Sequence, residues 1–371
     1  MRAGRWRDPR SGAITLSQWW AKWQEAQDFA PRTWEKYRGY FRNHIEPWRG
    51  SVPIREIDMT DAEAFDKQLR KRCAAATADG IMTVLRMLMD DAVEAGRLTF
   101  SPVRPKRSAR RGRRVPVTDP PRSGIAIDLR AFLAIVGRLP ADVALMATVA
   151  VFTGMRWGEL VGMRRSFLML VPADEDAVAQ GWYIIDDKIG AVHQPDTGKS
   201  SFGPPKNGKG RTIQLPPFLV EMLLAYIAAM PAGRDLLFVN RVGEPHRRGQ
   251  AAADAWRRAC DGWPEYPGRR GHTAYPAAPT IVEGLRFHDL RHTHKTWLVE
   301  DGIPAAMRDE RLGHGRRGRK DTEGAMDEVY VHATEVMRAR VLVALQERWE
   351  AAAAETAVLK TMISHSFPSR S

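Results

Sequence analysis

The sequence predicts a mainly α-helical protein of two domains, the second of which contains a small β-hairpin or sheet. The chain of 371 residues is too long for one ordinary domain. Apolar side chains recur at helical spacing along most of its length. A Pro- and Arg-rich segment at 102–124 interrupts that pattern and divides the chain in two.

Residues 14–101 are expected to form a compact bundle of about four helices. Thr15 or Ser17 is placed to cap the first helix, since either hydroxyl can accept a hydrogen bond from a free backbone N–H. The apolar residues of this helix are Trp19, Trp20 and Trp23. We expect these tryptophans to lie in the core of the bundle rather than to stack on bases.

The other helices of this bundle have recognisable starts and ends. One follows Pro31, with Thr33 as its expected cap. Another begins at Thr60-Asp-Ala-Glu63, which has the spacing of a capping box. The last is expected over 74–95 and ends at Gly96.

The segment 102–124 is expected to be a linker between the domains. Between Arg104 and Arg114 it contains seven cations and no acidic residue. Pro, Ser, Gly and Arg in this mixture cannot bury a core. Two roles stay open for it: a basic segment that follows a phosphate backbone, or a solvated tether.

The second domain is expected over 125–350, followed by a C-terminal tail at 351–371. Two short runs, at 181–187 and 211–215, are β-like and should form the hairpin or sheet. The remaining pattern is helical. The expected helices are 128–138, 141–152, one from about 156, 219–229, 250–261, 286–300, 303–312 and 334–358.

The charge balance favours a nucleic-acid partner. There are 57 Lys and Arg residues against 44 Asp and Glu, a net charge of +13, and 45 of the cations are arginines. The guanidinium is a planar fork of donors that matches phosphate geometry. A G+C-rich coding sequence would also enrich arginine, so composition alone leaves both explanations open.

The cysteine count and the lengths of the apolar runs exclude several classes of protein. Cys73 and Cys260 are too few for a disulfide framework or a Cys-rich zinc site. The longest apolar run, 144–152, is too short to span a membrane, and the basic N-terminus leads into no apolar stretch. We therefore expect a soluble, cytoplasmic protein with no membrane partner.

The segment 285–294 carries the most informative motif. On a helix, His288, Arg291 and His292 share one face, which suits an anionic ligand. The same residues, His288-Asp-Leu-Arg-His292, approach the zinc-protease pattern H-E-x-x-H. Asp in place of Glu, and an arginine beside the two histidines, argue against zinc.

Three further short motifs contain polar side chains with a chemical use. Arg156 and Glu159 are three residues apart, so the carboxylate can hold the guanidinium while its outer edge faces a ligand. The second motif is Leu312-Gly-His-Gly315. The third is Tyr330-Val-His332, which begins sixteen residues after His314. Each motif alone is a weak signal.

In this order the motifs resemble those of the tyrosine recombinases of the phage integrase family, over about residues 14–350. The matching patterns are T-G-x-R-x-x-E at 153–159, H-x-L-R-H at 288–292, L-G-H at 312–314 and Y-x-H at 330–332. The resemblance implies the two-domain tyrosine-recombinase architecture. A helical core-binding domain and an α+β catalytic domain would then close around duplex DNA.

The resemblance also assigns candidate site residues. The catalytic positions would be Arg156, Lys206, His288, Arg291, His314 and Tyr330, with Tyr330 as the nucleophile. Glu159 and His292 would support them. Lys206 is the expected lysine of the family's β-hairpin, and Lys209 is its alternate.

The implied activity is that of a site-specific DNA recombinase, an integrase of a phage or another mobile element. Attack by tyrosine on a phosphodiester would give a 3′-phosphotyrosyl link, without metal, ATP or another cofactor. One alternative is a relative that only binds DNA, which the complete set of catalytic residues disfavours. The other is DNA relaxation of the type IB topoisomerase kind, which the small size and the N-terminal bundle disfavour.

The implied partner is double-stranded DNA with core-type sites, bound by a homotetramer on two DNA sites. A directionality factor or a DNA-bending protein would be a further partner. The helix from Thr334 carries apolar residues that would pack either on a neighbouring subunit, as in the family, or on their own domain.

The sequence departs from the family pattern in three places. The gap from His314 to Tyr330 is long and holds an insertion, Gly315–Met326, whose cations are expected to touch DNA. The region 171–201 is expanded, which leaves the choice of hairpin lysine open. Only about thirteen residues precede the bundle, so we expect either the use of core sites alone or a truncated chain.

Overall fold

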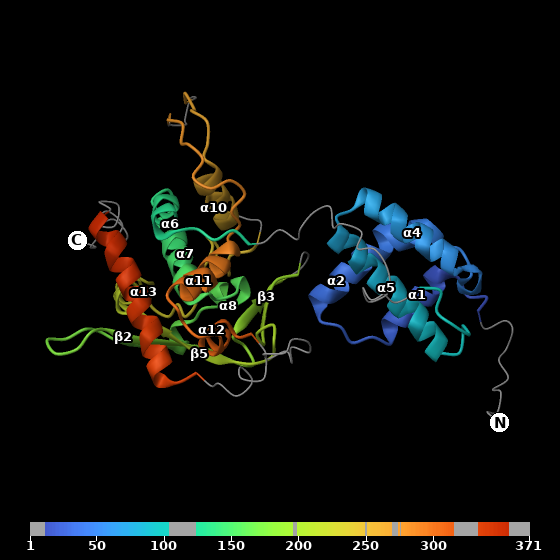
Figure 1. Ribbon diagram of the computed structural model, residues 1–371, viewed down its shortest axis with the longest axis horizontal. Helices are drawn as coiled ribbons and strands as arrows, with labels where there is room; N and C mark the ends of the chain where they lie inside the picture. The colour runs from blue at the N-terminus through green and yellow to red at the C-terminus, as the bar shows by residue number, and fades with distance from the viewer. Residues whose placement is uncertain are drawn as a thin grey trace. The chain divides into compact units, whose positions relative to one another are not determined.

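The computed structural model of the chain describes residues 12–103, 124–195, 199–248, 251–268, 274, 276–314 and 333–355. Its contacts divide the chain into two compact units, one made mainly of the residues before 104 and one of those after 123 (Figure 1). Each unit has a hydrophobic core of its own.

The N-terminal unit is a helical bundle, as predicted. Thr15 caps its first helix: the Thr15 hydroxyl accepts from the Gln18 N–H at 3.2 Å, and the Gln18 side chain accepts from the Thr15 N–H at 3.1 Å. The described helices are α1 Leu16–Glu25, α2 Pro31–Tyr40, a π-helical turn Phe41–Ile45, α3 Glu46–Arg49, a 3-10 turn Ile54–Glu56, α4 Met59–Arg72 and α5 Ala75–Glu94.

Two of the expected helix starts in this unit are wrong. Helix α2 begins at Pro31 after Ala30, so Thr33 already lies inside the first turn. Proline is well suited to the first helical position because it has no N–H to leave unpaired. Helix α4 is capped by Asp58, which forms the capping box with Asp61 two residues before the predicted one.

The tryptophans of α1 lie in the core, as predicted. The ring of Trp20 stacks on Phe41 with centroids 4.3 Å apart. The indole N–H of Trp19 donates to the Leu88 carbonyl at 2.8 Å, and that of Trp23 donates to Asp91 at 2.5 Å. With their indole N–H groups paired inside the bundle, Trp19 and Trp23 link α1 to α5.

The second unit combines helices with a small antiparallel sheet. Its helices are α6 Leu129–Val136, α7 Ala141–Thr153, α8 Trp157–Val161, the 3-10 turn Arg165–Phe167, α9 Pro217–Ala228, α10 Ala251–Asp261, α11 Asp289–Glu300, α12 Ala305–Leu312 and α13 Glu335–Glu355. Helix α7 is buried from Val143 to Thr153 and packs against α11. An apolar helix without a polar face is suited to the centre of a core.

In the part of the chain that the structure describes, no helix has both the length and the apolar character needed to cross a membrane.

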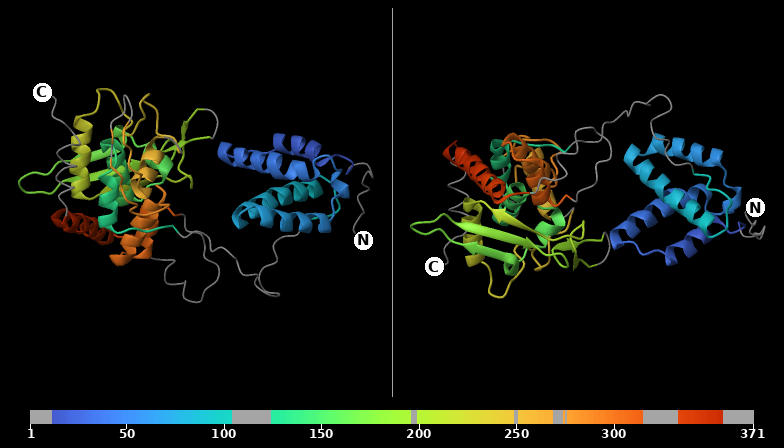
Figure 2. Two further views of the ribbon diagram at one scale, coloured as in Figure 1. Left: turned by 90° about the horizontal axis from the view of Figure 1, so that it is seen from above. Right: turned by 60° about the horizontal axis from the view of Figure 1, so that its bottom comes forward.

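The two predicted strand runs pair with each other. Strands β2 Gln180–Ile185 and β5 Arg211–Leu215 are antiparallel, with Tyr183 opposite Ile213. Strand β1 Leu168–Val171 completes a three-stranded sheet of order β1-β2-β5, which forms one layer of the unit (Figure 2). A second hairpin joins β3 Ala191–His193 to β4 Ser201–Gly203. The prediction of a mainly helical chain with a small sheet is confirmed, while β1, β3 and β4 are additional.

Candidate active site

Two glycine turns bring the sequence motifs together. Helix α7 is followed by Gly154 with φ +66°, and α12 is followed by Gly313 with φ +62°. These left-handed conformations favour glycine. Space requires it as well, because a Cβ at Gly154 would lie 2.6 Å from the His294 ring, and one at Gly313 would lie 2.8 Å from Arg211.

Arg291, on α11, is held by the carbonyls of both turns. Its Nη1 donates to the Gly154 carbonyl at 2.5 Å, and its Nη2 donates to the Leu312 carbonyl at 2.6 Å. Burial, and after it the charge of Arg156, lower the pKa of this guanidinium to about 9. Arg291 therefore remains a cation at neutral pH.

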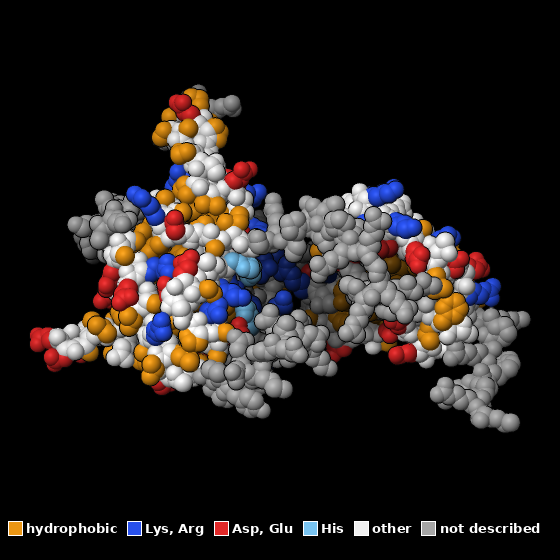
Figure 3. Space-filling model, viewed as in Figure 1, with side chains coloured by type: hydrophobic (Ala, Val, Ile, Leu, Met, Phe, Trp, Pro, Cys, Tyr) orange, Lys and Arg blue, Asp and Glu red, His pale blue; other side chains and the backbone are white. Residues whose placement is uncertain are grey.

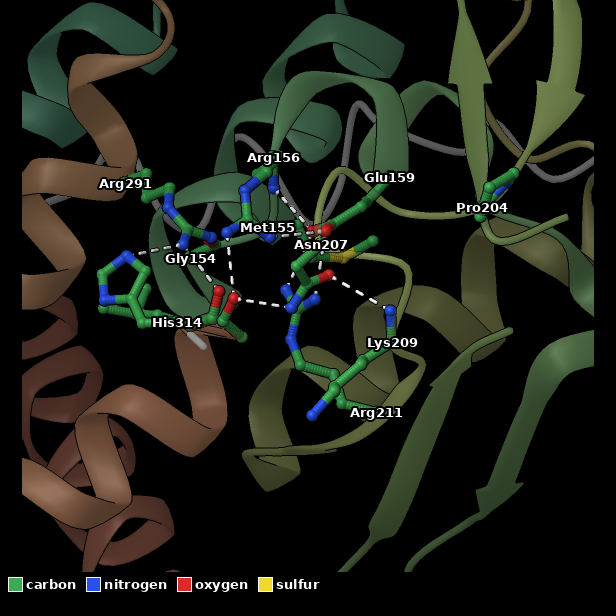
Figure 4. A network of polar contacts seen from close by, with 12 residues as sticks. Gly154, Met155, Arg156, Glu159, Pro204, Asn207, Lys209, Arg211, Arg291 and His314 are labelled. Atoms are coloured by element: carbon green, nitrogen blue, oxygen red, sulfur yellow. Dashed lines mark hydrogen bonds and ion pairs between the residues drawn. The ribbon is translucent and has the colours of Figure 1, made fainter. Parts of the chain in front are cut away.

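Arg156 lies at the start of α8 and shares a buried carboxylate with a third arginine (Figure 4). Glu159 accepts from Arg156 Nη1 at 3.0 Å and from both Nη atoms of Arg211, at 3.0 and 2.8 Å. Arg156 Nη2 also donates to the Gly313 carbonyl at 3.0 Å. Burial alone would raise the pKa of Glu159, but hydrogen bonds and charge from Arg211 and Arg156 lower it overall. Glu159 is therefore ionised and orients both guanidiniums.

His314 follows the second turn and contacts Arg291. Its Nε2 lies 3.1 Å from Arg291 Nη2, and its Nδ1 lies 3.2 Å from an Asp309 carboxylate oxygen. These partners favour the tautomer in which Nδ1–H donates to Asp309 and Nε2 accepts from the guanidinium. Burial lowers the pKa of His314, and Asp309 opposes that shift without reversing it.

His288 and His292 lie at the start of α11 with their ring centroids 5.8 Å apart. Both are exposed, and protein atoms around His288 together with the charge of Arg291 lower its pKa to about 4. Asp289, which stands where a zinc protease has its glutamate, is buried and accepts from Arg286 at 2.9 and 3.1 Å. Among the described residues, no group of three or more His, Cys, Asp or Glu side chains could hold a metal ion.

The lysine-bearing turn that precedes β5 reaches the same site. The Asn207 side chain donates to the Gly313 carbonyl at 3.0 Å, and the Lys209 backbone N–H donates to the Asn207 side chain at 3.4 Å. Lys206 and Lys209 are both exposed. Figure 3 shows histidine side chains beside lysine and arginine side chains on the face of the second unit in that view.

The predicted site residues thus fall into three groups. Those that the structure brings together around the two turns are Arg156, Glu159, Arg291 and His314, with the turn that carries Lys206 and Lys209 beside them. His288 and His292 adjoin Arg291 on α11. Tyr330, His332 and the insertion Gly315–Met326 lie outside the described residues.

Sequence reasoning missed Arg211, Arg311 and His294. The signal for Arg211 is present in the alternation of β5: Arg211, Ile213 and Leu215 fall on one face of the strand, and the latter two are core residues. An arginine at such an inward position requires a buried partner, which Glu159 supplies.

His294 and Arg311 form a buried pair beneath the two turns. Arg311 donates to His294 Nε2 at 3.1 Å and to the carbonyls of Gln214 at 3.0 Å and Phe152 at 2.9 Å. His294 Nδ1 lies 2.8 Å from the Val151 carbonyl, so Nδ1 carries the proton and the ring is neutral. Burial, and then the charge of Arg311, hold the pKa of His294 well below its ordinary value.

We expect this pair to make the second unit less stable in acid. The unfolded chain binds a proton at His294 near pH 6.5, whereas the folded chain does not, so stability is present above that pH and is lost as pH falls below it. One such proton changes the free energy of opening by at most about 1.4 kcal/mol per pH unit. Amide hydrogen exchange of peptides from α7 and α11, measured between pH 7.5 and 5, checks this.

His294→Gln serves as the matched variant, because its amide can still donate and accept but does not titrate. The variant should open more readily at pH 7.5, and its opening free energy should fall less steeply between pH 6.5 and 5. Equal slopes for the variant and the wild type would show that His294 does not set the acid sensitivity.

The comparisons with known proteins identify the family of the chain. The sequence model described as "Phage integrase family" matches residues 128–333, and that described as "Phage integrase, N-terminal SAM-like domain" matches 15–69. The integrase of Mycobacterium phage FRAT1 is 25% identical over 312 residues, covering 82% of this chain and 81% of that protein. The integrase of Mycobacterium phage L5 is 24% identical over 314 residues, covering 82% of this chain and 73% of that protein.

Solved structures share the fold. The Tn1549 transposon integrase (residues 82–397, Y379F) in complex with transposon right end DNA aligns with a TM-score of 0.62 at 15% identity, covering 92% of this chain and 100% of that one. A lambda integrase (75–356) dimer bound to a COC′ core site aligns with a TM-score of 0.51 at 19% identity, covering 84% and 98%. These likenesses confirm the two-domain architecture.

Fold, motifs and relatives together define a DNA-binding enzyme, a site-specific recombinase of the tyrosine type. The chain belongs to the phage integrase family.

Proposed function

We propose that the chain is the integrase of a phage or another mobile element and that it cuts and rejoins DNA through a 3′-phosphotyrosyl intermediate. The observation that carries this proposal is the convergence of two guanidiniums on two neighbouring turns. Arg291 bonds the carbonyls of Gly154 and Leu312, and Arg156 bonds the carbonyl of Gly313. Fixed in this way, both cations are placed to receive one phosphate group without rearranging.

In this proposal the arginines bind the non-bridging oxygens of the phosphodiester under attack. Charge develops on these oxygens, and donors that are already oriented stabilise it most. His314 supports them through its contact with Arg291 Nη2. Glu159 orients Arg156, and His292, beside His288, assists on the exposed side of α11.

The covalent step is assigned to Tyr330. Its oxygen forms a bond to phosphorus while the bond from phosphorus to the 5′-oxygen breaks. Lys206, with Lys209 as the alternate, gives a proton to the leaving 5′-oxygen. His288 is neutral at pH 7 because its pKa is lowered to about 4, so its lone pair is free for the tyrosine proton. The phosphotyrosyl bond keeps the energy of the broken bond, so rejoining needs no ATP.

The finer partners are proposals as well. A homotetramer on two core-type DNA sites is suggested by the lambda integrase tetramer bound to a Holliday junction, which aligns with a TM-score of 0.52 at 19% identity. Helix α13 gives no separate support, since Trp349 stacks on Phe218 of its own unit at 4.2 Å. A directionality factor or DNA-bending protein would choose between integration and excision. We place the reaction in the cytoplasm, with its DNA.

A domain division at 14–101, 102–124, 125–350 and 351–371 is part of the same proposal. In it the basic linker 102–124 would let the core-binding and catalytic domains lie on opposite sides of one duplex.

The test is covalent capture on DNA that contains the element's own flanking sequence. A substrate nicked next to the cleavage point loses its free 5′-OH fragment, so the covalent complex accumulates. With wild-type protein in EDTA we expect a protein–DNA adduct, and peptide mapping should place the nucleotide on Tyr330. No adduct, or an adduct on another residue, would contradict the proposal. Plasmid without flanking sequence should not be relaxed, which distinguishes a type IB topoisomerase.

A further inference from the structure

We propose that Arg211 is a positioning residue that links the lysine-bearing turn to the arginine site, so that the two halves of the site form together. The proposal rests on the proposed function and deepens it. Arg211 is the first residue of β5 and directly follows the turn that holds Lys206 and Lys209.

Each donor edge of Arg211 is used. Its Nη1 and Nη2 form a two-pronged ion pair with Glu159, at 3.0 and 2.8 Å, and its Nε donates to the Arg311 carbonyl at 2.9 Å. The side chain is only 7% exposed, and the Glu159 side chain is 1% exposed. A bidentate pair of this kind fixes direction as well as distance.

Arg211 and Arg156 both contact Glu159 of α8 and main-chain carbonyls at the C-terminal end of α12. Through Glu159, Arg211 sets the position of Arg156, and through the Arg311 carbonyl it holds the end of α12, just before Gly313. The Gly313 α-carbon packs against the same guanidinium, since a Cβ there would lie 2.8 Å from Arg211 Nη1. Arg211 is therefore enclosed between Glu159 and the second glycine turn.

The lysine-bearing turn is anchored on this assembly at two points. One is Arg211 itself, and the other is Asn207, whose side chain donates to the Gly313 carbonyl at 3.0 Å. That carbonyl also accepts from Arg156 Nη2 at 3.0 Å. Lys206 precedes Asn207 directly, so the path of this turn, and with it the reach of the lysine, depends on both anchors.

A chemical test separates positioning of the lysine from other roles. If sulfur replaces the 5′-bridging oxygen, the phosphorus–sulfur bond breaks to release a thiolate, which leaves without taking a proton. Substrates of this kind need no general acid. A variant that only misplaces the lysine should therefore recover on the sulfur substrate, while a variant with damaged phosphate binding should not.

The variant of choice is Arg211→Lys, which keeps the charge beside buried Glu159 but cannot form the fork. On the oxygen substrate we expect single-turnover cleavage to fall about 100-fold, as a displacement of about 1 Å can produce. On the sulfur substrate, the cleavage rate of the variant divided by that of the wild type should be at least tenfold higher than the same ratio on the oxygen substrate. Lys206→Ala should recover in the same way.

Matched controls keep the result interpretable. Arg164→Lys alters another partly buried arginine of the same unit, which pairs with Asp235 at 3.1 Å outside this network, and should leave both rates within twofold of wild type. Arg211→Lys should also bind DNA and melt as wild type does within a few degrees. The proposal is overturned if Arg211→Lys cleaves the oxygen substrate at the wild-type rate. It is also overturned if the cleavage rate of this variant falls by the same factor on the oxygen and the sulfur substrate. An inactive wild type would instead refute the recombinase mechanism itself.

Discussion

Replacing Tyr330 by phenylalanine should abolish covalent attachment to nicked DNA, because the change removes only the oxygen that is proposed to attack phosphorus. The expected loss exceeds that of any other single substitution, since no other group can form the same ester. Gel analysis of denatured protein with labelled DNA measures it directly. Binding to intact core-type DNA should stay within twofold of wild type.

Two other tyrosines of the second unit, Tyr183 and Tyr226, are poorly placed to substitute. Tyr183 is fully buried, and burial raises its pKa far above the ordinary value. The Tyr226 hydroxyl donates to the Leu237 carbonyl at 2.8 Å, and burial raises its pKa too. Tyr226→Phe is therefore the control variant, with an adduct yield equal to that of wild type. An adduct that persists in Tyr330→Phe would remove Tyr330 from the mechanism.

Arg291→Lys should reduce the rate of cleavage by about 10²–10³-fold, the usual effect of removing an oriented donor from a developing anion. A guanidinium can bond the Gly154 and Leu312 carbonyls and still direct further N–H groups at phosphate. A lysine ammonium is a single point with three donors and cannot span that arrangement. Single-turnover cleavage on the nicked substrate measures the effect.

DNA affinity of Arg291→Lys should change less than tenfold, because many phosphate contacts share the binding energy. Arg340→Lys, on the exposed side of α13, is the control and should cleave at the wild-type rate. A rate for Arg291→Lys within tenfold of wild type would show that the fork of Arg291 is not used in the transition state.

Much of the fold could be predicted because the strongest patterns are local. The helix of Trp19, Trp20 and Trp23 and the buried helix α7 follow from apolar spacing over a few turns. The first residue of a helix was harder to predict where two nearby residues could each act as the N-cap. Asp58 and Thr60 both have a partner three residues on, and aspartate is the better cap. Strands β3 and β4 have three residues each, too few for an alternation to be recognised.

The contacts of the site also divide into local ones, which the sequence could predict, and long-range ones, which it could not. The pair of Arg156 and Glu159 is local, so its spacing predicted the contact that the structure shows. Arg211 reaches Glu159 across 52 positions and Arg311 across 100, and no spacing rule reports such contacts. The catalytic roles, the boundaries of the domains and the choice between Lys206 and Lys209 stay predictions.

The way in which Arg291 is held has a consequence for how this family can diverge. Its partners at Gly154 and Leu312 are main-chain oxygens, which every amino acid supplies in the same place if the turn keeps its shape. Mutation of the surrounding side chains therefore leaves these hydrogen bonds available, provided that glycine stays at the left-handed positions. A site built on backbone groups tolerates drift, and relatives at 24–25% identity are a natural outcome.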